Sequence, residues 1–304
     1  MIKRTLYFGN PAYLHTENHQ LRIVKKGIGL ESSDTTHFVP IEDIGIVIFD
    51  HPQITFSHRV VDLLSDNNAV MIWCDEKHMP KSINLPLSNN DTYTEKLRYQ
   101  INASEPLKKQ LWKQTIECKI ENQARVLTKF GYEAQKLIKM ISRIQSGDPD
   151  NYEAQAAAIY WQQLLEPYHT TRGRYESEPN HYFNYGYAVL RAVIARNLVA
   201  SGCLPALGIH HSNKYNAFCL ADDLMEPYRP IVDYYIINYL KTLAECNPTL
   251  NKEDKTALLQ IPVLDIMIEG KKSPLFVGSQ RTTASFAQCM SGEKRKIVYP
   301  CLTD

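Results

Sequence analysis

The sequence lacks the features of a membrane-bound or exported protein. No apolar run among its 304 residues approaches the roughly 18 residues that a membrane-spanning helix needs. The first residues, Met1 to Leu6, contain no long apolar segment, so we expect no signal peptide. Internal repeats and low-complexity segments are absent as well. We therefore expect a globular protein that has no membrane partner.

Cysteine is present, but not in a pattern that builds a site. The 7 cysteines are odd in number, scattered along the chain, and include no Cys-x-x-Cys pair. This pattern argues against a disulfide framework and against a thiolate zinc site. It predicts a protein of the reducing cytoplasm.

An excess of one charge is also missing. The chain has 34 Lys and Arg against 33 Asp and Glu, which leaves a formal net charge of +1. No basic tract indicates nucleic-acid binding, so any basic groove would have to be formed by folding. The composition, 44% hydrophobic and 22% charged, is that of an ordinary soluble protein. Its length predicts two domains of about 150 residues each.

The first quarter of the chain has the pattern of β structure. Short apolar runs separated by turn residues predict strands, and Ile44 to Phe49 is a dense β-branched run that fits a buried strand. Thr16 to His19 predicts a hairpin turn, and Ser57 begins a short predicted helix. We expect an α+β protein with a small, mostly β domain, a polar linker, and a larger all-α catalytic domain. Their expected ranges are 1–75, 76–92 and 93–304.

Glu153 is the first candidate for a chemical role. Ala154, Ala157 and Trp161 continue an apolar stripe at helical spacing, and Glu153 borders this stripe in the first turn. Two interpretations remain open. Asp150 and Glu153 have the spacing of a capping box, in which the carboxylate only accepts a backbone N–H. Alternatively, the small alanines let another element approach closely, as a shared metal site requires. Spacing alone favours the cap.

A second candidate segment contains a histidine pair followed by carboxylates. His210 and His211 lie in a polar loop after Gly202, Pro205 and Gly208. Asp222, Asp223 and Glu226 follow on a predicted helix. This is a weak metal signal, because a histidine in such a loop is more often a packed, hydrogen-bonded residue.

Several cations could contact phosphates. Arg172 and Arg174 form a loop-like pair suited to bidentate phosphate contact. Arg191 and Arg196 lie in a nearly all-apolar helix and need partners, because an unpaired buried charge is costly. Carboxylates and DNA phosphates would both serve, and the residues alone do not choose between them. The basic candidates are Arg172, Arg174, Arg191, Arg196, Lys214 and Arg229.

Taken in order, these segments resemble the CRISPR-associated integrases of spacer acquisition. The resemblance rests on Tyr152-Glu153-Ala154, on Asn184 to Arg191, and on the Gly202-x-Leu204-Pro205-x-x-Gly208-x-x-His211 pattern. It rests finally on Leu220-Ala221-x-Asp223-Leu224-Met225-Glu226-Pro227, which continues to Pro230. The sequence of these motifs is similar to that of integrases from systems with a single large effector nuclease.

The resemblance implies a metal-dependent DNA integrase and endonuclease. In such a protein a 3′-hydroxyl end of a short DNA fragment attacks a phosphodiester at the edge of a CRISPR repeat. The resemblance also implies that Glu153, His211 and Asp223 are the catalytic residues and share one divalent ion, either Mg²⁺ or Mn²⁺. The histidine favours Mn²⁺, because Mg²⁺ prefers oxygen ligands. The register remains open at residues 210 and 211 and at residues 222 and 223. The implied partners are double-stranded DNA fragments, repeat DNA, a second copy through the β domain, and a small ferredoxin-fold subunit.

Two rival functions remain. A metal-dependent hydrolase of small molecules would need a deep pocket, and the paired arginines argue mildly against it. A non-catalytic DNA-binding scaffold would use Glu153 only as a cap and His211 only as a core residue.

Overall fold

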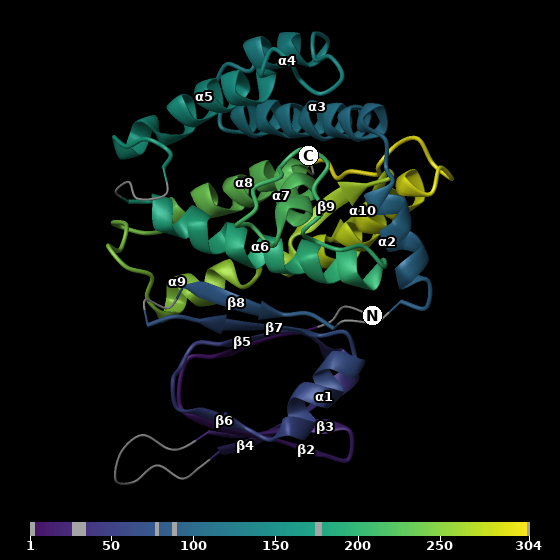
Figure 1. Ribbon diagram of the computed structural model, residues 1–304. Helices are drawn as coiled ribbons and strands as arrows, with labels where there is room; N and C mark the ends of the chain where they lie inside the picture. Colours follow the sequence, from purple (N-terminus) through teal and green to yellow (C-terminus); the bar gives the residue numbers. More distant parts are fainter. Residues whose placement is uncertain (1–3, 26–34, 77–78, 87–89, 174–177, 303–304) are drawn as a thin grey trace. The chain divides into compact units, whose positions relative to one another are not determined.

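The computed structural model describes residues 4–25, 35–76, 79–86, 90–173 and 178–302. The chain divides into two compact units between residues 89 and 90. The first unit is rich in strands and the second in helices, so the predicted α+β class is confirmed (Figure 1). Arg174, predicted to contact phosphate, lies outside the described residues.

In the described residues of the N-terminal unit, two four-stranded sheets are accompanied by helix α1 (Figure 1). The sheets have the orders β1-β5-β7-β8 and β4-β3-β2-β6. Every residue of β5 is buried, as its continuous apolar run predicts. Helix α1 adds Val60 and Leu64 to a core that draws on both sheets. The elements are β1 Arg4–Phe8, β2 Ala12–Glu17, β3 Gln20–Lys25, β4 Thr35–Pro40, β5 Ile44–Phe49, β6 Ile54–Phe56, α1 His58–Asp66, β7 Val70–Cys74 and β8 Pro80–Asn84.

The predicted hairpin is present, but the predicted linker contains a strand. Asn18 and His19 both have positive φ angles, which joins β2 and β3 by a tight turn of the hairpin type. Strand β8 lies inside the expected linker 76–92 and pairs antiparallel with β7. The sequence did not predict β8, because an edge strand with exposed residues needs no alternation of apolar and polar residues. The first compact unit runs to residue 89, and the expected domain ranges stay a prediction.

Helix α3 organises the C-terminal unit. It lies between α4 and α5 on one side and α7 and α8 on the other (Figure 1). Its N-cap is Ser104, whose hydroxyl accepts the N–H of Leu107, as the sequence predicts. Helix α6 is buried over most of its length. The helices are α2 Tyr93–Ile101, α3 Glu105–Lys129, α4 Gln135–Ile141, α5 Tyr152–Leu165, α6 Asn180–Ala200, α7 Cys219–Met225, α8 Arg229–Leu240, α9 Lys252–Leu258 and α10 Leu275–Met290.

The helical unit is not purely helical. Strands β9 (Asp265–Ile268) and β10 (Lys271–Pro274) form a hairpin, and Cys301 near the C-terminus pairs with Met267 of β9. The expectation of an all-α domain was wrong in this detail, because four-residue strands carry too little periodicity to be seen. Short 3-10 turns also occur, at Glu166–Tyr168, Glu226–Tyr228 and Ile261–Val263. No helix in the described part of the chain is long and apolar enough to cross a membrane.

Candidate metal centre

Glu153 is not part of a capping box. The N-cap of α5 is Asn151, whose side chain accepts the N–H of Ala154. The carboxylate of Asp148 accepts the N–H groups of Tyr152 and Glu153, both at 2.9 Å. The start of the helix is thus satisfied without the Glu153 side chain, and the capping role considered for Asp150 and Glu153 is wrong. The Glu153 carboxylate is therefore not needed to cap α5.

The carboxylate of Glu153 lies against a buried lysine. Lys119 on α3 places its Nζ 2.7 Å from Glu153 Oε1 and 2.6 Å from Glu226 Oε2. Burial alone lowers the pKa of Lys119, but the charges of Glu226 and Glu153 outweigh burial and raise it. The pKa of Glu226 is lowered, because Arg229 and Lys119 outweigh the upward effect of burial. Both shifts favour the charged forms of Lys119 and Glu226.

His211 is held by Asp223. Its Nδ1 lies 2.5 Å from Asp223 Oδ1, and the Asp223 carboxylate also accepts the backbone N–H groups of Ile209, His210 and His211. Gly208 makes this tight loop possible, since a Cβ there would lie 2.2 Å from the His211 carbonyl oxygen and 2.8 Å from Asp223 Oδ2. Asp223 is fully buried, whereas the side chain of His211 is 45% exposed. The loop therefore holds the imidazole through Nδ1 while part of the ring stays exposed.

Electrostatics link this imidazole to the lysine-bridged carboxylates. The pKa of His211 is raised by its hydrogen bond with Asp223, against the downward effect of burial. The charges of Asp223, Glu226 and Glu153 raise it further. Charges on α5, on α7 and in the following 3-10 turn thus contribute to the raised pKa of His211.

The neighbours of the site residues have structural partners. The ring of His210 stacks on Trp112 with centroids 4.0 Å apart. Asp222 accepts hydrogen bonds from Arg191 Nε at 2.6 Å and Asn216 Nδ2 at 2.7 Å. His211 and Asp223 instead bond to each other, which is the register that the sequence resemblance implies.

Glu226 lies in the segment that the sequence analysis singled out, but it was not among the three ligands that the resemblance implies. It follows Asp223 by three positions, so it lies one helical turn further on and was visible in the Leu-Met-Glu-Pro motif. Its side chain is 4% exposed, and Oε2 is a buried oxygen without an aligned hydrogen bond in the described structure, although Lys119 lies close to it. In the described part of the chain, no three His, Cys, Asp or Glu side chains are arranged as a ready-made metal site. The lysine ammonium lies between two of the carboxylates.

Comparisons with known proteins identify the family of the chain. A family model described as CRISPR associated protein Cas1 matches residues 6–260. The chain belongs to this family. A CRISPR-associated endonuclease Cas1 of Neisseria meningitidis serogroup C (strain 8013) is 34% identical over 301 residues, which cover 97% of this chain and 95% of that protein. A second Cas1 endonuclease, from Pyrobaculum aerophilum, is 26% identical and covers 88% of this chain and 94% of its own length.

Solved structures show the same fold. A casposase bound to integration product has a TM-score of 0.79 and 17% identity, and the match covers 98% of this chain and 92% of that chain. A Cas1 protein from Thermotoga maritima has a TM-score of 0.76 and 13% identity, covering 95% and 97%. A chain of a Cas6-RT-Cas1–Cas2 complex has a TM-score of 0.71 and 17% identity, covering 96% of this chain and 35% of that one.

The basic candidates of this Cas1-family chain differ in availability. Arg196 is 3% exposed, donates to Asn197 Oδ1 and stacks on Phe276, so its burial argues against the phosphate contact that we predicted. Arg191 pairs with Asp222 but keeps 38% of its side chain exposed. Arg229 pairs with Glu226 at 3.1 Å and lies over the ring of Tyr187.

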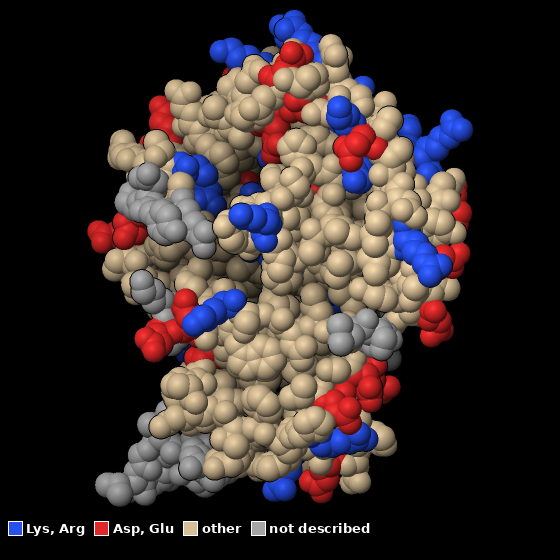
Figure 2. All heavy atoms as spheres, in the orientation of Figure 1, with Lys and Arg blue, Asp and Glu red and all other residues tan. Residues whose placement is uncertain are grey.

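Two other cations are placed by aromatic rings. Arg172 donates to Asn180 Oδ1 and Asn184 Oδ1, and its guanidinium lies over the rings of Trp161, Phe183 and Tyr187. Lys214 is exposed and lies over Tyr215, which is itself 85% exposed. On the face drawn in Figure 2, acidic and basic side chains are mixed, and basic ones border a hollow in the helical unit.

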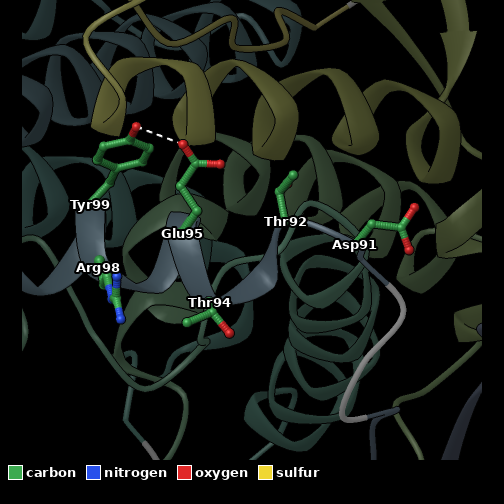
Figure 3. A pocket seen from close by; sticks show the side chains of 6 residues that line it. All are labelled: Asp91, Thr92, Thr94, Glu95, Arg98 and Tyr99. Carbon is green, nitrogen blue, oxygen red and sulfur yellow. Dashed lines mark hydrogen bonds between the residues drawn. The ribbon is translucent and has the colours of Figure 1, made fainter.

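A second hollow lies elsewhere. A pocket of about 530 Å³ runs along α2, where Tyr99 donates a hydrogen bond to Glu95 (Figure 3). It contains none of the residues of the metal centre. Its lining residues are Asp91, Thr92, Thr94, Glu95, Arg98 and Tyr99.

Proposed function

We propose that this chain is a divalent-cation-dependent DNA integrase and endonuclease that inserts short DNA fragments into a CRISPR repeat array. The observation that carries the proposal is that Glu153 and Glu226 meet at Lys119 Nζ, while Asp223, three residues before Glu226, orients His211. Relatives over nearly the whole chain are named CRISPR-associated endonucleases, and a protein of the same fold is described as a casposase bound to integration product.

We propose Glu153, His211 and Glu226 as the ligands of one cation. Two carboxylates and an imidazole suit Mn²⁺, and Mg²⁺ is the other candidate, although it prefers oxygen ligands. A metal-binding histidine usually gives its second ring nitrogen to a carboxylate, which fixes its orientation. Asp223 has this relation to His211, and its oxygens are already engaged by backbone N–H groups. Asp223, the third ligand implied by the sequence resemblance, therefore fits a positioning role better.

The protein groups around this centre hold and orient. Arg229 holds Glu226, and Asp223 holds the imidazole of His211. A bound cation supplies stabilisation of the charge that develops on a phosphodiester under attack by a DNA 3′-hydroxyl. The exposed or half-exposed cations Arg172, Arg191 and Lys214 are the phosphate contacts that we propose, with Arg174 still a prediction. Their contribution to affinity falls steeply as salt rises.

The proposed partners follow from the family. We propose double-stranded fragments with 3′-hydroxyl ends and repeat DNA as substrates, with action as a homodimer. A solved complex that contains a chain of this fold is described as Cas1–Cas2, which supports assembly with a small second CRISPR-associated subunit. We propose a ferredoxin fold for that subunit.

The test is joining of a 3′-hydroxyl DNA end into a repeat target with Mn²⁺. We expect Glu153→Ala, His211→Ala and Glu226→Ala each to abolish joining while the variants stay folded by circular dichroism. Asp223→Asn should lose roughly 10- to 100-fold in activity or cation affinity, because an orienting partner is weakened. His210→Ala is the matched control and should retain joining, since His210 stacks on Trp112.

Each outcome decides something. Full joining by folded Glu226→Ala, together with loss in Asp223→Asn, would return the third ligand to Asp223. Full joining by all three alanine variants would leave a DNA-binding scaffold without this chemistry. Cleavage of a small molecule without DNA joining would favour the hydrolase.

A further inference from the structure

Lys119 is the one group of the metal centre to which the proposed reaction assigns no task. It lies in the middle of α3, in a buried position that a long cationic side chain seldom occupies without a partner. Its Nζ is within 2.7 Å of one oxygen of Glu153 and one oxygen of Glu226. These are the two carboxylates that we propose as ligands.

The Lys119 ammonium neutralises the two carboxylates when no divalent cation is bound. Two carboxylates facing each other in a buried site repel, and each pays a large desolvation cost unless a cation neutralises it. Among the ion pairs of the described residues, Arg229 pairs with Glu226 and not with Glu153. Lys119 is the cation that touches both carboxylates in the described structure, so it holds the pair together.

The same contact opposes a divalent ion. A ligand oxygen that lies against an ammonium must release it, or share its charge with it, before it can coordinate a metal. The carboxylates of Glu153 and Glu226 are balanced by Lys119 and Arg229, so the cluster has little negative charge left to attract a dication.

We propose that Lys119 is an internal counter-ion that occupies the Glu153–Glu226 pair and must be displaced from it when a divalent cation binds. This inference rests on the proposed function, because it takes those carboxylates as ligands. By this proposal, Lys119 lowers the affinity for a divalent cation and stabilises the fold when no cation is bound. A lysine that merely positions the carboxylates for the metal would act in the opposite direction, so the sign of one measurement separates the two roles.

The first experiment compares Mn²⁺ affinity by calorimetry in the full-length protein. We expect Lys119→Met to bind Mn²⁺ more tightly, on the order of tenfold, which corresponds to about 1.4 kcal/mol. It should also show a larger rise in melting temperature on Mn²⁺ addition than the unchanged protein, because the stabilisation by a bound ligand rises with the logarithm of its affinity. Lys119→Arg keeps the charge and should not gain affinity.

Lys113→Met is the matched control. Lys113 lies on the same helix and pairs with Glu117 at 3.5 Å, with a third of its side chain exposed. Its removal should leave Mn²⁺ affinity unchanged. Weaker or equal binding by Lys119→Met would overturn the inference.

A second experiment needs no folded methionine variant. The ¹⁵Nζ resonance of Lys119, assigned by its absence in Lys119→Arg, is followed in the unchanged protein during titration with Mg²⁺. We expect it to shift with the midpoint of Mg²⁺ binding, as the ammonium leaves the carboxylates. A resonance unmoved at saturating Mg²⁺ would overturn the inference.

These tests are distinguishable from a failure of the proposed function. If the unchanged protein neither binds Mn²⁺ nor joins DNA, the function fails. If it binds Mn²⁺ and joins DNA while the Lys119 results go against expectation, only the role of the lysine fails.

Discussion

At the scale of single residues, partners decide between neighbours that the sequence cannot separate. His210 and His211 are identical in type, yet one stacks on Trp112 and the other bonds Asp223. Asp222 and Asp223 differ in the same way, because one holds Arg191 and the other holds the histidine loop. In each pair, one residue therefore contacts a neighbouring element and the other belongs to the His211–Asp223 contact.

Asp233 gives a pH prediction at this scale. It is buried on α8 and accepts hydrogen bonds from the hydroxyls of Tyr160 and Tyr187, and burial raises its pKa from 3.8 to about 7. A raised folded-state pKa favours the protonated fold, so this stabilisation is complete below the unfolded pKa and is lost as the pH rises through about 7.

Asp233→Asn removes that titration. We expect its free energy of unfolding, relative to the unchanged protein, to improve by on the order of 4 kcal/mol between acid pH and pH 8. Urea denaturation across this range measures it. A difference between the two proteins that does not vary with pH would contradict the raised pKa.

At the scale of elements, the start of α5 determines where Glu153 lies. Asn151 has φ 54° and caps the helix with its side chain, while Asp148 accepts the next two N–H groups. Asparagine tolerates this left-handed conformation better than most residues. The turn frees the Glu153 carboxylate to face α3.

Two substitutions at Asn151 separate cap from conformation. Asn151→Ala loses the cap and also strains the backbone, and we expect it to lower the free energy of unfolding by about 1–2 kcal/mol. Glycine suits the positive φ, so Asn151→Gly should lower the free energy of unfolding by only a few tenths of a kcal/mol. Urea denaturation at neutral pH compares them. Equal losses in both variants would show that the left-handed conformation is not what matters.

At the scale of the whole molecule, the C-terminal segment closes the helical unit. Asn122 on α3 is fully buried and donates to the carbonyls of Pro227 and Pro300, while its oxygen accepts the N–H of Leu302. Gln114 bonds the backbone of Arg295 and Ile297 in the same way. Helix α3, which carries Lys119, thus bonds both the tail and the turn that contains Glu226.

Removal of residues 297–304 tests this closure. The truncation exposes apolar surface around Ile297 and Leu302 and leaves the buried Asn122 amide short of partners. We expect a loss of several kcal/mol in the free energy of unfolding, together with loss of Mn²⁺-dependent joining. Thermal denaturation and the joining assay measure the two effects. A truncated protein of unchanged melting temperature would show that the tail is dispensable.

The sequence by itself determined the class of the fold and the segments that carry the site. Strand β5, the β2–β3 turn and the Ser104 cap were predictable because their signals lie in adjacent residues: a β-branched run, turn residues and a cap. The ordered motifs around Glu153, His211 and Asp223 pointed to the family. Weak local signals were lost, namely the polar edge strand β8 and the short hairpin β9–β10.

Only the tertiary structure decided which side chains meet. Lys119 lies 34 positions before Glu153, and Glu226 lies far beyond both. No local pattern links them, because their contact depends on how α3 packs against α5 and the turn after α7. The sequence alone favoured a cap for Glu153, whereas packing gave it a buried ammonium as partner. The residue types were legible from the sequence, but the electrostatic pairing that turns them into a site exists only in the packed fold.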